Sequence, residues 1–395
     1  MAHTKLKICV VVGGVGWSLL LVYVMSSLNW GPGDTKDSHT RSLHFKQAEN
    51  IPLARAAKSH VLIGELIEAS KNNKNKTNRA AGQGQVISPQ QVKHIHQLNN
   101  TIKLESQSQV NIVISGDGDT LLGVIAVMNS ALINTKTPVH FYITLPKEII
   151  PDFRLWVKKS KLQEVTYTVK PHPPQLPKGK PHFAKVYLLS IFPKLEGRFV
   201  YLPPDVIIQG DISELAGVTL MSKSLGAFAD DCHSSTRHRQ GSSAGPLYVG
   251  HLNLHHPKLR SRGIKPAACT FDTDVFVADT RKWRTANVTD QLIAWVNTST
   301  SENLFGANPE VDSSEAAMLI VMYKRTSPLP HLWHLSGLGM SPGAGYSKEY
   351  VKAAKLLRWD GHFKPWGRRS AFSDVWYHYT LPDPLNKYRP KKIYT

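Results

Sequence analysis

The residue whose type and position most clearly suggest a chemical role is Asp205, a carboxylate that follows a short run of mainly apolar residues. It lies in the segment V-Y-L-P-P-D-V-I-I-Q-G-D-I-S-E-L, residues 200–215, which has the pattern of a buried strand, a turn and a second short strand. In open α/β sheets, ligands bind just beyond the carboxyl ends of the strands. The segment therefore predicts that Asp205 belongs to a functional site at a strand end.

The elements that must position this acid alternate between strand and helix patterns from residue 110 onward. The predicted strands are 110–115, 139–144, 164–169 and 198–202, and the predicted helices are 120–133, 147–158 and 183–192. Such alternation is typical of α/β domains, in which helices cover both faces of a sheet. The sequence therefore predicts one α/β domain over residues 110–395, with a mainly parallel sheet.

Six segments together resemble a known family of enzymes. They are Y-L-P-P-D-V-I-I-Q-G-D-I (201–212), I-S-G-D-G-D-T-L-L-G-V-I-A-V-M-N-S (114–130), F-A-K-V-Y (183–187), G-A-F-A-D-D-C (226–232), C-T-F-D-T-D-V-F-V-A-D (269–279) and A-A-K-L-L-R-W-D-G-H-F-K-P-W (353–366). In order and spacing they resemble the retaining glycosyltransferases of family 8, most closely the animal glycosyltransferase 8 domain-containing proteins. The resemblance implies a GT-A (Rossmann-like) fold, a UDP-sugar donor, Mn²⁺, and retention at the anomeric carbon. It does not identify the acceptor, which can be a glycan, a protein or a lipid.

The resemblance also assigns roles to single residues. Asp230 matches the acid that contacts the donor sugar, although Asp231 beside it is an equally good surface or helix-capping acid. Lys185 matches a cation that pairs with donor phosphate or with carboxylates of the site. Asp230 and Lys185 are the catalytic candidates. The donor-binding candidates are Ser115 and Asp117 near uridine, Lys364 near the diphosphate, and Asp205, Asp272, Arg358 and Gly361.

Three departures from the family pattern affect the implied metal site. Pro203 replaces the first acid of the D-x-D motif, so only Asp205 remains. Arg358 stands where the family has a histidine ligand, and a guanidinium cannot bind a metal. In F-D-T-D-V, Asp272 replaces an asparagine and Asp274 a glycine, which creates a second D-x-D that we interpret as incidental. One carboxylate is a poor site for Mn²⁺.

Three functions are compatible with these departures. The first is a family 8 glycosyltransferase that is weak or independent of metal, with the cations Arg358, Lys185 and Lys364 acting on the phosphates. The second is a pseudoenzyme that binds a nucleotide sugar or glycan, and the third is a lectin-like binding protein. The site also predicts that Arg358 lies within salt-bridge reach of Asp205, with an ordinary surface arginine as the alternative.

The N-terminal residues predict a membrane anchor. Residues 8–28, I-C-V-V-V-G-G-V-G-W-S-L-L-L-V-Y-V-M-S-S-L, are uncharged and long enough to span a bilayer, and two lysines precede them. A cleaved signal peptide is the alternative, but no A-x-A site follows. We expect a cytoplasmic tail (1–7), a transmembrane signal-anchor (8–28), a polar luminal stem (29–109) and the luminal domain, as in type II membrane proteins of the Golgi.

Composition agrees with this topology. Cys9 lies inside the apolar span, which leaves Cys232 and Cys269 as a possible disulfide, with two separate thiols as the alternative. Sequons for N-glycosylation occur at Asn75, Asn99, Asn287 and Asn297. The net charge of +19 favours anionic partners such as nucleotide diphosphates, but no nucleic-acid-binding motif is present.

Overall fold

Seven strands form the central sheet, in the order β3-β2-β1-β4-β7-β6-β8. In the computed structural model, the described residues are 109–232, 246–304, 312–343 and 345–388, and they fall within a compact unit of residues 88–395. The strands of the main sheet are β1 (Val110–Ser115), β2 (Val139–Leu145), β3 (Thr166–Pro171), β4 (Arg198–Leu202), β6 (Gly226–Asp230), β7 (Phe271–Asp279) and β8 (Thr326–Pro328).

The sheet is parallel except for β7. Strand β1 pairs in parallel with β2 and β4, and β2 pairs in parallel with β3. Strand β7 runs antiparallel to both β4 and β6, and β6 pairs in parallel with β8. Most residues of β1, β4 and β7 are buried, because both faces of the sheet are covered and the strands are rich in Val, Ile and Phe.

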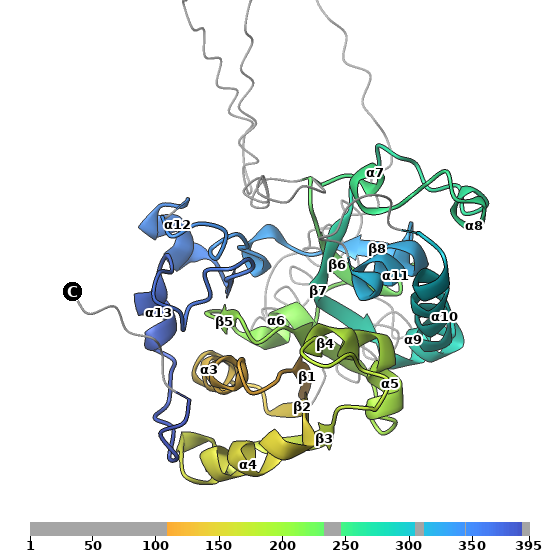
Figure 1. Cartoon of the computed structure of the whole chain (residues 1–395). Coiled ribbons are helices and arrows are strands. Elements are labelled where there is room, and N and C mark those ends of the chain that lie inside the picture. Colours follow the sequence, from red (N-terminus) through yellow and green to blue (C-terminus); the bar gives the residue numbers. More distant parts are fainter. Residues whose placement is uncertain (1–108, 233–245, 305–311, 344, 389–395) are drawn as a thin grey trace, which may run out of the picture. The chain divides into compact units, whose positions relative to one another are not determined.

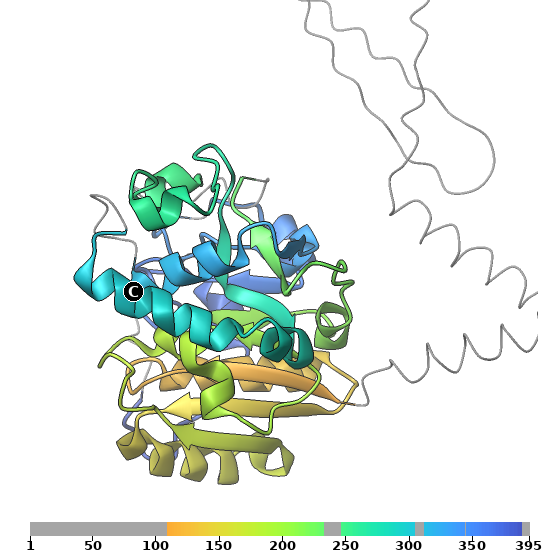
Figure 2. The same cartoon turned by 90° about the vertical axis from the view of Figure 1, so that its right-hand side faces the viewer.

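Helices cover the two faces of the sheet, as Figure 1 shows. One face packs against α3 (Leu121–Asn134), α4 (Ile150–Lys158) and α13 (Ser373–Tyr377). The other packs against the 3-10 helix η3 (Pro181–Tyr187) and against α9 (Thr280–Thr285), α10 (Val288–Ser301) and α11 (Ser313–Met322), and α10 crosses in front of the strands in Figure 2. Alternating residues of β1 divide between the two cores: Ile112 and Ile114 face one, and Val113 the other.

The remaining helices are all short. They are η1 (Lys147–Ile149), η2 (Lys161–Glu164), α5 (Leu188–Ile191), α6 (Ile212–Ala216), α7 (Tyr248–His251), α8 (Pro257–Arg260), η5 (His331–Trp333) and α12 (Lys348–Ala353). Aspartates begin several helices by accepting backbone N–H groups: Asp211 at α6, Asp279 at α9 and Asp312 at α11.

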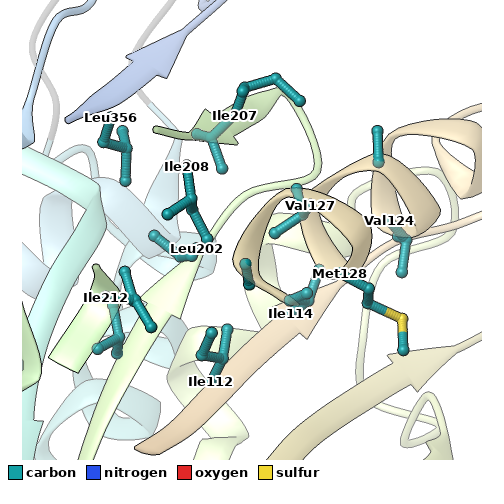
Figure 3. Close-up of a cluster of buried hydrophobic side chains, with 14 of the residues drawn as sticks. Ile112, Ile114, Val124, Val127, Met128, Leu202, Ile207, Ile208, Ile212 and Leu356 are labelled. Carbon is teal, nitrogen blue, oxygen red and sulfur yellow. The ribbon is translucent and has the colours of Figure 1, made fainter. Parts of the chain in front are cut away.

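A second, two-stranded sheet lies above α3 and carries part of the candidate site. It pairs β5 (Val206–Ile208) with β9 (Leu356–Arg358), antiparallel, with Val206 opposite Arg358. Figure 3 shows the apolar contacts that hold it: Ile207, Ile208 and Leu356 pack near Val127 of α3 and Leu202 of β4. This packing places β9, and therefore Arg358, directly beside the end of β4.

The predicted α/β class and its strand–helix alternation are confirmed. Strands β1 and β4 have the predicted bounds, and the other predicted elements differ by a few residues at their ends. The predicted tail, membrane span and stem lie outside the described residues except for residue 109. Among the residues that are described, no helix has both the length and the apolar character needed to cross a bilayer.

Candidate functional site

The candidate residues gather at one edge of the main sheet. Because β1, β4 and β6 point the same way, Ser115, Asp205 and Asp230 all lie at or just beyond carboxyl ends of strands. Strand β7 is antiparallel, so its beginning lies at this same edge, where Phe271 pairs with Asp230. The acids that follow Phe271 therefore face the strand ends that the sequence analysis identified.

Arg358 is at the centre of a buried charged network. It is 5% exposed and lies at the end of β9, where its guanidinium donates hydrogen bonds to Asp272 and, over 2.6 Å, to Asp274. The side chain of Asp272 is 1% exposed, and its carboxylate also contacts Nε2 of His334 at 2.9 Å. The guanidinium is therefore held by two carboxylates of β7.

Two lysines complete the network. Lys185 of η3 is 1% exposed and donates to Asp274 over 2.6 Å and to the Thr273 hydroxyl over 2.9 Å. Lys364 pairs with Asp205 and donates to the carbonyl oxygen of Trp359 over 3.0 Å. We call these three cations and their carboxylates the charged network; its members are Lys185, Asp205, Asp272, Asp274, Arg358 and Lys364.

The pKa values of the network follow from opposing effects. Burial alone would lower the pKa of Arg358, but Asp272, Asp274 and Asp205 raise it well above its usual range. Burial also acts to lower the pKa of Lys185, but Asp274, Asp312 and Glu315 together more than offset this, so the net shift is upward. For Asp274, burial would raise the pKa, but Lys185 and Arg358 lower it to about 2. Arg358, Lys185 and Asp274 are therefore charged at neutral pH.

The predicted approach of Arg358 to Asp205 is confirmed, but the two side chains are at the far end of salt-bridge distance. Nε of Arg358 lies 3.8 Å from Oδ1 of Asp205, and neither atom makes a hydrogen bond in the described part of the chain. The closer partner of Asp205 is Lys364, and those of Arg358 are Asp272 and Asp274. Both acids of the second D-x-D, which we interpret as an incidental match to the metal motif, bind the central arginine.

The donor set does not fit a divalent metal ion. Asp205 is flanked by two cationic side chains, and the oxygens of Asp272 and Asp274 are engaged by Arg358, Lys185 and His334. A cation at Asp205 would meet the positive charge of Arg358 and Lys364 at close range. In the described ranges, the three candidate ligands that come together are Asp230, Cys232 and Cys269, and the two sulfurs are bonded to each other.

The remaining predicted residues surround the network. Ser115 donates to the carbonyl oxygen of Pro181 over 2.5 Å and so joins the end of β1 to η3, which carries Lys185. Asp117 accepts from the backbone N–H of Thr120, which fixes the turn before α3. Gly361 has φ of +91°, and a Cβ there would lie 2.7 Å from the carbonyl oxygen of Gly339, so the loop before Lys364 requires glycine.

Asp230 is anchored beside a disulfide. Its carboxylate accepts from the backbone N–H of Cys232 over 2.7 Å. Cys232 and Cys269 form the predicted disulfide, with Cα atoms 5.7 Å apart, and this bond ties the segment after β6 to the segment before β7. Asp231 is buried and accepts from the Thr270 hydroxyl over 2.7 Å, so it has a structural contact of its own.

Two of the four sequons lie in the described part of the chain. Asn287, which precedes α10, and Asn297, within α10, are both exposed. Asn75 and Asn99 lie outside the described residues. Glycosylation at these sites stays a prediction.

Sequence reasoning missed several residues of the site. His334 contacts Asp272, Thr273 contacts Lys185, and His182 pairs with Asp312 near Lys185. Thr273 could have been found, because it stands between two recognised acids. His334 follows η5 in a segment without a recognisable motif, so its role depends on the tertiary structure.

A cavity of about 810 Å³ adjoins η3. It is lined by residues of β3, η3 and α10 and of the segment between β3 and η3, among them Lys170, Phe183 and Tyr187, but by none of the charged network. Volume alone therefore does not locate the site, and the convergence of charged groups at the sheet edge does.

Close packing at Gly123 gives a first testable prediction. A Cβ at this position of α3 would lie 2.2 Å from the carbonyl oxygen of Pro204 and 2.8 Å from the Trp366 ring. We expect Gly123→Ala to lower the free energy of unfolding by about 2 kcal/mol, because overpacking of about 3 kcal/mol outweighs the roughly 1 kcal/mol that alanine contributes to a helix. Urea unfolding measures this change.

Gly343→Ala is the matched control for this substitution. A Cβ at Gly343 meets no atom within 4 Å, so a change within about 0.5 kcal/mol is expected. An unfolding midpoint for Gly123→Ala equal to that of the unmodified chain would show that α3 does not press on Pro204 as described.

Comparison with known proteins supports the same family as the sequence motifs. The model of the family "Glycosyl transferase family 8" matches residues 111–370. Glycosyltransferase 8 domain-containing protein 1 is 36% identical in Xenopus tropicalis over 71% of this chain and 80% of the relative, and 33% identical in Homo sapiens over 73% and 82%. Glycosyltransferase 8 domain-containing protein 2 of Macaca fascicularis is 30% identical over 72% of this chain and 86% of the relative.

Solved structures show the same fold at low sequence identity. The apo structure of the bifunctional glycosyltransferase WbbM has a TM-score of 0.52 and 12% identity, and the match covers 83% of this chain and 64% of that one. An active-site mutant of LgtC has a TM-score of 0.50 and 13% identity, with 69% of this chain and 98% of that one covered. The fold is therefore GT-A-like, with the mostly parallel sheet described above. The chain belongs to glycosyltransferase family 8 and is a glycosyltransferase.

Proposed function

We propose that this glycosyltransferase takes its sugar from a UDP-sugar, retains the anomeric configuration, and binds the donor diphosphate with Arg358, Lys185 and Lys364 in place of a divalent metal. Family 8 enzymes generally use UDP-sugar donors and divalent metals. The observation that carries the proposal is the guanidinium of Arg358, which lies among the carboxylates of Asp205, Asp272 and Asp274.

Cationic side chains can perform the task that the metal has in relatives. When the sugar leaves the donor, the bond between its anomeric carbon and the phosphate oxygen breaks, and the diphosphate carries away the electron pair. Fixed cations next to the departing oxygens stabilise that charge without reorganisation. Arginine is suited to this because its planar guanidinium binds phosphate through two parallel hydrogen bonds and keeps its charge.

The other members of the site receive roles from their positions. Ser115 and Asp117, at the end of β1, are assigned to the uridine end of the donor, as in the resemblance. Lys364 is one-third exposed and is the cation of the network most open to a diphosphate. Asp230, anchored by Cys232, is assigned to the transferred sugar.

In the same proposal the chain is a type II membrane protein of the Golgi, with the family 8 domain in the lumen. The support is the uncharged segment of residues 8–28, the lysines before it, and a disulfide in the enzyme domain. Staining of the tagged chain against Golgi markers, with and without selective permeabilisation, tests both the compartment and the orientation.

Titration of UDP tests the metal-free donor site. We expect the full-length chain to bind UDP with the same dissociation constant in EDTA and in MnCl₂, because the cations are supplied by side chains. Lys364→Met should weaken binding about tenfold or more, since one charge-assisted hydrogen bond contributes about 1.5–3 kcal/mol.

Lys387→Met is the control, because Lys387 forms an exposed ion pair with Asp152 on α4 outside the network. Its UDP affinity should equal that of the unmodified chain. Binding that needs Mn²⁺ would refute the metal-free site, and the absence of UDP binding by every variant in both buffers would refute the donor assignment.

A further inference from the structure

The charged network is electrically neutral as a whole. Its cations are Lys185, Arg358 and Lys364, and its carboxylates are Asp205, Asp272 and Asp274, so three positive charges meet three negative ones. A diphosphate brings two or more negative charges into this site. Since no positive charge is in excess within the network, a bound diphosphate must share cations that already have anionic partners.

Among the carboxylates of the network, Asp274 is the most accessible. Its side chain is 24% exposed, against 8% for Asp205 and 1% for Asp272. Its two oxygens bridge two cations: Oδ1 lies 2.6 Å from Nζ of Lys185, and Oδ2 lies 2.6 Å from a terminal nitrogen of Arg358. An anion that bridges two buried cations in this way has the geometry expected of a bound phosphate group.

The other two carboxylates are less exposed, and that of Asp272 has further hydrogen-bond partners besides the cations. Asp272 accepts from the backbone N–H of Asp274 over 2.7 Å and contacts His334 as well as Arg358. Asp205 adjoins β5, and its backbone carbonyl accepts from the N–H of Trp359 over 2.9 Å. Within the described ranges, the hydrogen-bond partners of the Asp274 carboxylate are Lys185 and Arg358, so it can be displaced from them without breaking other hydrogen bonds of that side chain there.

We propose that Asp274 is a built-in counter-anion, which occupies Arg358 and Lys185 in the free protein and competes with the diphosphate of the donor for them. The inference rests on the proposed function, because it takes a nucleoside diphosphate as the ligand of the site. Asp274 would then control the affinity for the donor. Its carboxylate keeps the two buried cations paired when no donor is bound, and the same contacts weaken donor binding.

Asp274→Asn tests the competition directly. The substitution removes one negative charge and leaves the network with a positive excess of one. UDP, titrated into the full-length chain in EDTA, should bind about tenfold more tightly to the variant than to the unmodified chain. At the same time the variant without UDP should unfold at lower urea concentration, because a buried cation loses its partner. A purely structural acid would lower stability without raising affinity.

Asp152→Asn is the matched control. It removes the same charge from α4, where Asp152 pairs with Lys387 and Tyr388, and its UDP affinity should stay within about twofold of the unmodified chain. Asp274→Ser serves as a second variant if the asparagine variant fails to fold. It also removes the carboxylate, and the same tightening is expected.

The outcomes separate the two proposals. If UDP binds the unmodified chain and Asp274→Asn or Asp274→Ser binds it equally or more weakly, the counter-anion is refuted while the donor site stands. Tighter binding in Asp152→Asn of the same size would also refute it, since a long-range charge effect would then explain the result. If UDP binds neither the unmodified chain nor the variants, the proposed function fails, and the counter-anion with it.

Discussion

Replacing Arg358 by methionine should lower the free energy of unfolding by about 3–5 kcal/mol, the range measured when one partner of a buried ion pair is removed. Arg358 is 5% exposed and is shared by Asp272, Asp274 and, at longer range, Asp205. Methionine fills a similar volume, so the loss comes from the charges that stay behind rather than from a cavity. Denaturant unfolding followed by tryptophan fluorescence measures it.

A second substitution should restore part of this loss. Asp272→Asn keeps the side-chain oxygen that accepts the backbone N–H of Asp274 but removes the most deeply buried negative charge of the network. Arg358→Met combined with Asp272→Asn should therefore be more stable than Arg358→Met alone.

The control for Arg358→Met is Lys387→Met, which breaks an exposed pair and should change stability by at most about 1 kcal/mol. If Arg358→Met unfolds at the same denaturant concentration as the unmodified chain, the guanidinium does not neutralise buried carboxylates, and the account of the charged network fails.

Removing the disulfide should cost about 3–4 kcal/mol of stability. Cys232 and Cys269 are separated by 37 residues, and chain-entropy estimates for loops between 15 and 100 residues run from about 3 to 4.7 kcal/mol. We expect Cys232→Ala combined with Cys269→Ala to show this loss in denaturant unfolding. The effect should also reach the site, because the backbone N–H of Cys232 holds Asp230.

Cys9→Ala is the control, since Cys9 takes no part in this bond, and it should leave stability unchanged. Thiol titration of the denatured, unreduced chain should find one free sulfhydryl of the three cysteines, and three after reduction. Three free sulfhydryls before reduction would show that the bond does not form, and the expected loss of stability would then have no basis.

Local pattern was sufficient to predict most of the elements and the cations of the site. The bounds of β1 and β4 follow from short apolar runs, which strands of a covered sheet require. Asp205 could be placed at a strand end because it comes directly after such a run. Lys185, Arg358 and Lys364 could be named because each lies in a motif of the family. These properties reside in contiguous residues, so the sequence determined them by itself.

The pairing of the charges was decided by the tertiary structure. Arg358 binds Asp272 across 86 residues of sequence, and Lys364 binds Asp205 across 159. The first pair exists because β7 is antiparallel, which brings its beginning, with Asp272 and Asp274, to the carboxyl edge of β4. From the sequence, Asp205 was the expected partner of Arg358, and Asp272 was named as a donor-binding candidate but not as a partner of the arginine.

The contact between His334 and Asp272 was also decided by the tertiary structure, because no local sequence pattern identifies this histidine. An ion pair or hydrogen bond forms where folding brings two groups within a few ångströms, and strand order, strand direction and the packing of β9 on α3 together set that distance. The composition of the site was therefore largely encoded in local motifs. Which cation neutralises which carboxylate, and hence how much positive charge is left for a donor, depends on long-range packing that single motifs do not specify.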